Sequence, residues 1–145
     1  MEKIHYYNTK VTWKEERIGT LTEDGMPPIK IATPPEFPKG VPNIWSPEHL
    51  FIASANICLM TTFLAIAELS KLDFVSYECE GKGKLEKIDG KFMVSEIILI
   101  PKVVIKDELL KEKTLRILDK SESNCLISNS MKTKITLKPE IIINK

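Results

Sequence analysis

Apolar and polar positions alternate along the first third of the chain, which is the pattern of β-strands. Residues 3–13 are rich in β-branched and aromatic side chains, and a second extended run leads to the turn Asp24-Gly25. A short third strand is expected over residues 29–33. A stiff, irregular loop follows, containing Pro34, Pro35, Pro38, Gly40 and Pro42. This part of the chain is therefore predicted to form a hairpin and a third strand.

The strongest helix signal begins at Ser46. Ser46 can cap the helix, Pro47 suits the first helical position, where its missing N–H costs nothing, and Glu48 suits the positive end of the helix dipole. A helix is predicted over residues 47–70. Its side chains are apolar almost all the way round from Leu50 to Leu69, which is typical of a helix enclosed by other structure. We expect it to form the axis of the core.

After Leu72 the hydrophobic period changes to two, which predicts a long hairpin with its turn at Asp89-Gly90. Pro101 should interrupt this ladder or mark a strand edge. Helical spacing follows over residues 107–119, a short helix over 125–131, and a last strand over 134–143. This order of elements predicts an α+β fold, with an antiparallel sheet and helices packed to one side.

Composition favours one domain, residues 1–145, with no affinity for nucleic acid. The 145 residues carry 21 basic and 20 acidic side chains, a formal charge of +1. The apolar stretch 51–67 is short for a membrane span and contains polar residues, and residues 1–5 lack the features of a secretion signal. We expect a cytoplasmic protein without a membrane segment. A chain of this size has difficulty covering so apolar a helix, so we also expect a homodimer.

The three cysteines are widely spaced and contain no C-x-x-C pair, which favours free thiols over a disulfide framework or a zinc site. Cys58 lies mid-helix among small side chains, and its alternative role is a packed core thiol. Cys125 follows Ser121, Glu122, Ser123 and Asn124, any of which could cap the short helix and place its sulfur near positive backbone dipoles. Cys79 alternates onto an apolar face, where a core role is favoured.

A mid-helix thiol gains nothing from the dipole of its own helix, so lowering the pKa of Cys58 is expected to require a cation. Arg17 and Arg116 are the only arginines. Arg116 lies among lysines on an amphipathic helix, where a solvated face is the simpler explanation, and Arg17 could equally form a surface ion pair with a neighbouring acid. Glu48 could orient an arginine or merely stabilise the start of its helix.

Other chemistries find little support in the sequence. His5 and His49 are isolated, with no spacing suited to a metal, and a structural or surface role is expected for both. Phosphate-loop, dinucleotide and serine-hydrolase motifs are missing from the sequence. Thiol redox chemistry is therefore the leading hypothesis, without a metal or bound cofactor.

Two segments together resemble the OsmC/Ohr family. The segment from Ser46 to Cys58, SPEHLFIASANIC, is similar to the family's central-helix motif, in which P-E-x-L precedes small residues and a cysteine. The segment from Cys125 to Ser130, CLISNS, is similar to its second motif, a cysteine that opens a short helix with C-P-x-S-x character. Leu126 stands where proline is common in that motif. The order of predicted elements agrees across almost the whole chain.

This resemblance implies an intertwined homodimer with active sites at the subunit interface. It also implies that Cys58 is the peroxidatic nucleophile, that Cys125 is the resolving cysteine, that Arg17 activates Cys58 and that Glu48 holds Arg17. The Cys58 thiolate would attack a hydroperoxide and become a sulfenic acid, which Cys125 would convert to a disulfide. An external dithiol or lipoyl-type reductant would then restore both thiols.

An apolar lining from Phe51 and nearby aliphatic side chains is expected to favour organic hydroperoxides over hydrogen peroxide. Two other functions stay open on the sequence alone. The chain could be a non-enzymatic module that holds a small ligand at the dimer interface, with packed cysteines, or a redox sensor that signals through a partner.

Overall fold

The computed structural model describes residues 3–144, which divide into two compact units with the boundary between Leu50 and Phe51. Met1, Glu2 and Lys145 belong to the predicted single domain but lie outside the described residues. The expectation of one domain over residues 1–145 stays a prediction.

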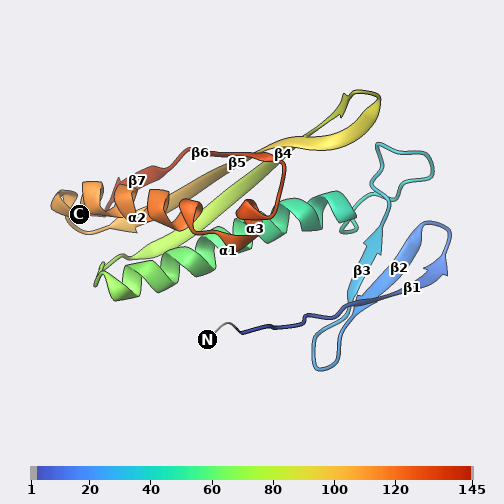
Figure 1. Cartoon of the computed structure of the whole chain (residues 1–145), viewed down its shortest axis with the longest axis horizontal. Coiled ribbons are helices and arrows are strands. Elements are labelled where there is room, and N and C mark those ends of the chain that lie inside the picture. Colours follow the sequence, from blue (N-terminus) through green and yellow to red (C-terminus); the bar gives the residue numbers. More distant parts are fainter. Residues whose placement is uncertain (1–2, 145) are drawn as a thin grey trace. The chain divides into compact units, whose positions relative to one another are not determined.

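The first unit contains an antiparallel sheet of β1 (Lys10–Glu15), β2 (Ile18–Thr22) and β3 (Ile29–Ala32), in that order (Figure 1). The predicted turn is present, and Gly25 has a φ of +78°, a conformation that glycine adopts without strain. The prediction of a strand beginning at residue 3 is wrong, because residues 3–9 have no regular structure. Their side chains are exposed, so their β-forming composition has no packed surface to fit.

A long helix, α1 (Pro47–Leu69), begins where the sequence predicts it. The Ser46 side chain is fully buried, and its hydroxyl oxygen accepts a hydrogen bond from the His49 backbone N–H at 3.1 Å. This bond satisfies one of the N–H groups that a helix start leaves without a partner. The predicted cap at Ser46 is confirmed.

The second unit is built on the hairpin of β4 (Ser76–Ile88) and β5 (Lys91–Ile105). Asp89 and Gly90 both have positive φ, 51° and 79°, as a two-residue hairpin turn requires. On the other side of β5 lie β6 (Lys134–Leu137) and β7 (Glu140–Ile143), and both run parallel to it. The expected all-antiparallel sheet is therefore wrong at this edge, because a chain that crosses back through helices re-enters the sheet in the parallel direction.

Pro101 lies inside β5, which continues past it to Ile105, and Cys79 of β4 pairs with it. β6 pairs with residues 96–99 and β7 with residues 102–105, so the neighbouring ladder on that side is broken opposite Pro101. The prolyl nitrogen, which has no hydrogen to donate, is thus placed at a gap. The single predicted strand over residues 134–143 is two strands, separated by Lys138 and Pro139, and Pro139 likewise has no N–H to donate.

Three helical segments connect β5 to β6: the 3₁₀ turn η1 (Glu108–Leu110), α2 (Lys111–Ser123) and α3 (Leu126–Asn129). The odd-numbered side chains of β5 are buried from Ile97 to Ile105. They pack in two clusters with α1 and α2, which include Leu59 and Phe63 of α1 and Leu118 of α2. Because one face of β5 receives both helices, the helices lie on one side of the sheet (Figure 1), and the α+β class is confirmed.

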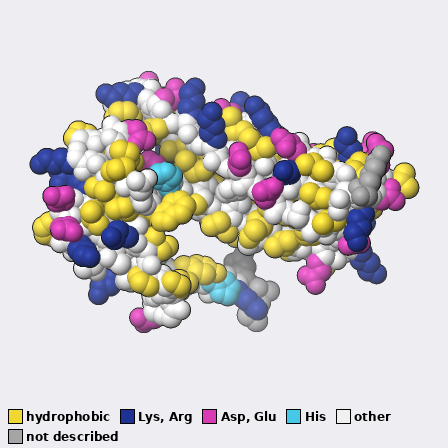
Figure 2. Space-filling model, turned by 180° about the vertical axis from the view of Figure 1, so that it is seen from behind, with side chains coloured by type: hydrophobic (Ala, Val, Ile, Leu, Met, Phe, Trp, Pro, Cys, Tyr) yellow, Lys and Arg dark blue, Asp and Glu magenta, His cyan; other side chains and the backbone are white. Residues whose placement is uncertain are grey.

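Within the single chain only one face of α1 is covered, and the expectation that a second subunit completes its enclosure stays a prediction. Ala55, Cys58, Leu59, Phe63 and Ala67 are buried, whereas other apolar side chains of α1 are exposed, including Ile57 at 56% and Leu64 at 42%. Large hydrophobic side chains are also exposed on other parts of the chain, and Figure 2 shows hydrophobic side chains across the face that it presents. By length and composition alone α1 could cross a membrane, but its covered face packs on the sheet as in the core helix of a soluble fold.

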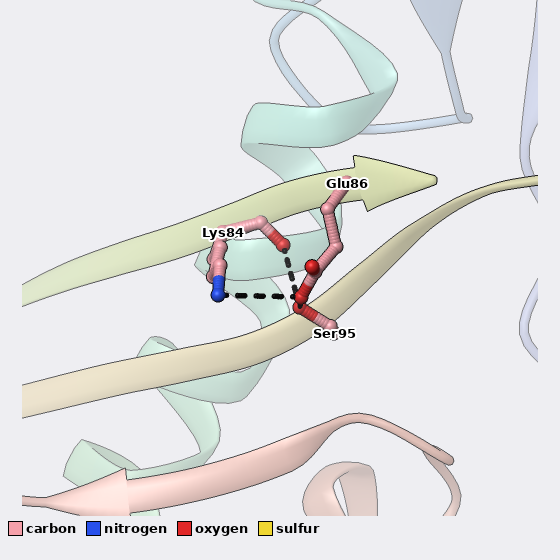
Figure 3. Close-up of polar contacts among 3 residues, drawn as sticks. All are labelled: Lys84, Glu86 and Ser95. Carbon is pink, nitrogen blue, oxygen red and sulfur yellow. Dashed lines mark hydrogen bonds and ion pairs between the residues drawn. The ribbon is translucent and has the colours of Figure 1, made fainter. Parts of the chain in front are cut away.

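A polar cluster marks a bulge in the β4–β5 hairpin. The register shifts between Lys84 and Leu85, and Ser95 lies on the opposite strand. The Ser95 hydroxyl donates a hydrogen bond to the Glu86 carboxylate, and the Lys84 ammonium lies 3.4 Å from the same carboxylate oxygen (Figure 3). The Ser95 hydrogen bond links the two strands where the ladder is irregular, whereas the Lys84–Glu86 ion pair lies within β4.

Candidate active site

The structure brings Cys58 and Cys125 together inside the second unit. Cys58 lies in the middle of α1, and α3 begins beside this part of the helix (Figure 1). Cys125 is the N-cap of α3. Its side chain and the backbone N–H groups of Leu126 and Ile127 lie close enough to the Cys58 sulfur to act on its pKa. Both residues are free thiols with almost no exposure, 8% for Cys58 and 0% for Cys125.

The pKa of Cys58 is lowered even though burial acts to raise it. The opposing effect comes first from the Cys125 thiol, then from the Ile127 N–H, the Thr62 hydroxyl and the Leu126 N–H, all of which stabilise the thiolate as hydrogen-bond donors. Thr62 lies one helical turn beyond Cys58, with its hydroxyl oxygen 3.9 Å from the sulfur. Cys58 is therefore the thiol of this pair that ionises more readily.

The pKa of Cys125 is raised, first by burial and then by the hydrogen bond that its thiol gives to Cys58. The side chain and backbone N–H of Ser128 act in the opposite direction. Placement at a helix start therefore does not make Cys125 the more acidic thiol. The expected side-chain caps are also wrong, because Ser121, Glu122 and Ser123 belong to α2, Asn124 ends it, and Cys125 itself is the cap.

The expectation that Cys58 needs a cation to lower its pKa is wrong. Backbone N–H groups at the start of α3 supply part of the effect, from a helix other than the one that carries the cysteine. Arg116 is exposed on α2, as expected of a solvated face. Arg17 is exposed in the turn between β1 and β2 and belongs to the first unit, so its role at Cys58 remains a prediction.

Glu48 lies in the first turn of α1 and is half-buried. Its Oε1 atom is buried and has no hydrogen-bond partner within residues 3–144. Over the same range, Arg17 and Glu48 do not form an ion pair. The helix-start position of Glu48 matches its structural explanation, whereas the unsatisfied oxygen marks a place for a donor.

Ser128 and Glu122 extend the site on the far side of Cys125. The Ser128 hydroxyl lies close enough to both the Cys125 thiol and the Glu122 carboxylate to lower their pKa values, but it makes no hydrogen bond of standard geometry with any of the described residues. Sequence reasoning missed both of these residues and the part played by Thr62. The spacing C-x-x-S from Cys125 to Ser128 was the available signal.

Cys79 and Tyr77 lie on β4 near Glu122. Burial raises the pKa of both groups, and the buried Tyr77 hydroxyl has no hydrogen-bond partner of standard geometry among residues 3–144. Cys79 is half-buried and packs against the cluster that contains Leu59, in line with its predicted core role.

His5 and His49 belong to the first unit, and the hollow beside Phe51 belongs to the second. His49 is exposed, with its Nδ1 atom 2.7 Å from the Ser46 hydroxyl and its ring edge-on to Trp45. Phe51 lines a hollow of about 390 Å³ together with Met93, Val94 and residues 130–133, and neither cysteine is part of that lining. Within residues 3–144 no cluster of three His, Cys, Asp or Glu side chains is suited to a metal ion.

Comparison with known proteins identifies the family and relatives of this chain. The family model described as OsmC-like protein matches residues 40–140. The uncharacterized protein YmaD of Bacillus subtilis is 27% identical over 141 residues, which cover 94% of this chain and 93% of YmaD.

Solved structures share the whole fold. An OsmC-like protein of unknown function from Vibrio cholerae superposes with a TM-score of 0.83 at 27% identity, covering 94% of this chain and 99% of the other. The organic hydroperoxide resistance protein OhrB of Bacillus subtilis superposes with a TM-score of 0.68 at 23% identity, covering 93% and 98%. Because the family model matches well over half of the sequence, the chain belongs to the OsmC-like protein family.

Proposed function

We propose that this protein is a cysteine-based peroxidase that reduces organic hydroperoxides. Membership of the OsmC-like family supports a peroxide-related redox role, since several relatives of this fold are named organic hydroperoxide resistance proteins. The observation that carries the finer proposal is the contact between Cys58, whose pKa is lowered, and the neutral thiol of Cys125. A thiolate beside a second thiol is the arrangement that peroxide reduction followed by disulfide formation needs.

The proposed reaction has two steps. The Cys58 thiolate attacks the distal oxygen of ROOH, the O–O bond breaks, and the products are Cys58 sulfenic acid and RO⁻, which takes a proton to become an alcohol. The Cys125 sulfur then attacks the Cys58 sulfur, which forms the disulfide and releases water. A dithiol or lipoyl-type reductant from outside returns both cysteines to thiols, and no bound cofactor takes part.

Arg17 and Glu48 are proposed to act together beside Cys58. A buried carboxylate oxygen without a partner is costly, and the Glu48 Oε1 atom is in this position. An arginine can offer two donors to such a carboxylate and keep others for a thiolate or a peroxide oxygen. We therefore assign Glu48 the task of holding Arg17.

The proposal includes a homodimer in the cytoplasm, with the second copy covering the exposed face of α1. Side chains such as Ile57, Met60 and Leu64 form an apolar stripe on this face. Exposed apolar stripes of this kind are typical of protein interfaces, and covering them stabilises both partners.

Peroxide consumption in the presence of dithiothreitol tests the enzymatic role. Wild-type protein should consume cumene hydroperoxide faster than hydrogen peroxide, because the apolar surroundings favour an organic substrate. The variant C58S should lose the activity, since a hydroxyl cannot replace the thiolate, whereas C79S should retain it. Equal, slow consumption by all three proteins would contradict the proposal and favour a ligand-binding module.

A further inference from the structure

The second step of the proposed reaction needs a proton acceptor, which the two cysteines do not themselves supply. Cys125 must lose its proton to attack the Cys58 sulfenic acid, since the thiolate is the reactive form. Its side chain is fully buried, and burial together with its hydrogen bond to Cys58 raises its pKa. Solvent has no direct access to this proton, so a neighbouring group has to accept it.

Two buried oxygens beside Cys125 have no standard hydrogen-bond partner within residues 3–144: the Ser128 hydroxyl and Glu122 Oε2. Ser128 lies one turn along α3 and Glu122 lies in the last turn of α2, and the Ser128 hydroxyl acts on both the Cys125 thiol and the Glu122 carboxylate. Buried polar atoms without partners are rare and often mark a functional site. Here both oxygens occur at the same helix junction as the buried Cys125 thiol, which must be deprotonated.

The backbone holds these three residues in a fixed relation. The Cys125 N–H donates to the Glu122 carbonyl at 3.1 Å, and the Asn129 N–H donates to the Cys125 carbonyl at 3.0 Å. The junction of α2 and α3 is therefore a tight turn that keeps Glu122, Cys125 and Ser128 within one short stretch of backbone.

We propose that Glu122 accepts the proton of Cys125 through the hydroxyl of Ser128 when the disulfide forms. This inference rests on the proposed function. The Cys125 S–H bond breaks as its proton passes to the Ser128 oxygen, and the Ser128 proton passes to the Glu122 carboxylate. The Cys125 sulfur bonds to the Cys58 sulfur, whose S–O bond breaks, and the departing hydroxide takes a proton from Glu122 or solvent to become water. Cys58 is reduced from sulfenic acid as Cys125 is oxidised.

The surroundings of Glu122 favour proton uptake by its carboxylate. Burial raises its pKa, and Ser128 partly offsets this effect. The groups on other elements that interact with it are Ser128 on α3 and Tyr77 and Cys79 on β4. Tyr77 and Cys79 have raised pKa values and stay neutral at pH 7. A carboxylate in such a setting accepts a proton more readily than an exposed one.

Rapid mixing of the reduced full-length protein with one equivalent of cumene hydroperoxide separates the two steps. Sulfenic acid is trapped with dimedone, and disulfide is quantified by quenching and mass spectrometry. In E122Q and S128A, sulfenic acid should form at the wild-type rate, while disulfide formation should slow by about 100-fold, the usual contribution of a positioned base. E112Q, which removes an exposed carboxylate from the first turn of α2, is the matched control and should behave as wild type.

The pH profile separates a proton acceptor from a structural residue. Disulfide formation in wild type should level off once Glu122 is ionised, whereas in E122Q its rate should keep rising with hydroxide concentration. E122D, which keeps a carboxylate, should recover part of the rate. The proposal is overturned if E122Q forms the disulfide at the wild-type rate with the wild-type pH profile, or if both steps slow equally as expected of a damaged fold. If wild type forms no sulfenic acid, the proposed function fails first and this inference fails with it.

Discussion

At the scale of single residues, the chemistry of Cys58 depends on what surrounds its sulfur. Burial by itself would favour the neutral thiol, but donors from Cys125, Thr62 and the start of α3 favour the thiolate. The same hydrogen bond that lowers the pKa of Cys58 raises that of Cys125. The two thiols are therefore unequal before any peroxide arrives, and each is suited to a different step.

This inequality predicts the effect of Cys125→Ala on the reactivity of Cys58. The variant removes the strongest of the donors that lower the pKa of Cys58, so the pKa should rise and the thiolate should form only at higher pH. The rate of Cys58 alkylation by iodoacetamide, followed by mass spectrometry across pH, should shift its midpoint upward relative to wild type. Cys79→Ala should leave the midpoint unchanged, and a downward shift in Cys125→Ala would contradict the assigned roles.

Residue types alone were enough to single out Cys58 and Cys125, but they did not predict which groups surround the two sulfur atoms. The amides of Leu126 and Ile127 act on Cys58 through backbone atoms that every non-proline residue possesses, so no side-chain pattern marks them. Ser128 and Glu122 could be recognised as site residues only from the structure of the junction between α2 and α3. An arginine is not needed to lower the pKa of Cys58, because donors at the start of α3 act on its sulfur from outside the helix that carries it.

At the scale of elements, α1 has two apolar faces with different surroundings. Leu59 is fully buried against β5, whereas Leu64 is 42% exposed. The sequence predicted the helix and its cap, because both depend on local spacing. The sequence did not predict which face of α1 is buried, because a helix that is apolar on all sides has no pattern that distinguishes a buried face from an exposed one.

The two faces of α1 should respond differently to substitution. Leu59→Ala should lower the free energy of unfolding by about 2 to 5 kcal/mol, since it leaves a cavity in the core. Leu64→Lys should leave the chain folded but dissociate the proposed homodimer, because it places a charge in the apolar stripe. Chemical denaturation and sedimentation velocity measure the two effects. A dimer of undiminished affinity in Leu64→Lys would show that the second copy does not cover this face.

At the scale of the whole molecule, the α+β class could be predicted because strand and helix periods differ clearly along the chain. The parallel edge formed by β6 and β7 could not, since the direction of a strand depends on how the preceding helices cross the sheet. Family membership links this fold to proteins named for resistance to organic hydroperoxides. The account of function therefore rests on the cysteine pair within that fold.

The most direct test of the central claim is the identity of the bond that peroxide creates. Reduced protein is treated with one equivalent of cumene hydroperoxide, blocked with iodoacetamide, digested without reductant and mapped by mass spectrometry. We predict a cross-linked peptide pair that joins Cys58 to Cys125, with Cys79 alkylated as a free thiol. Oxidation that stops at Cys58 without a cross-link, a bond that involves Cys79, or three unoxidised cysteines would contradict the account.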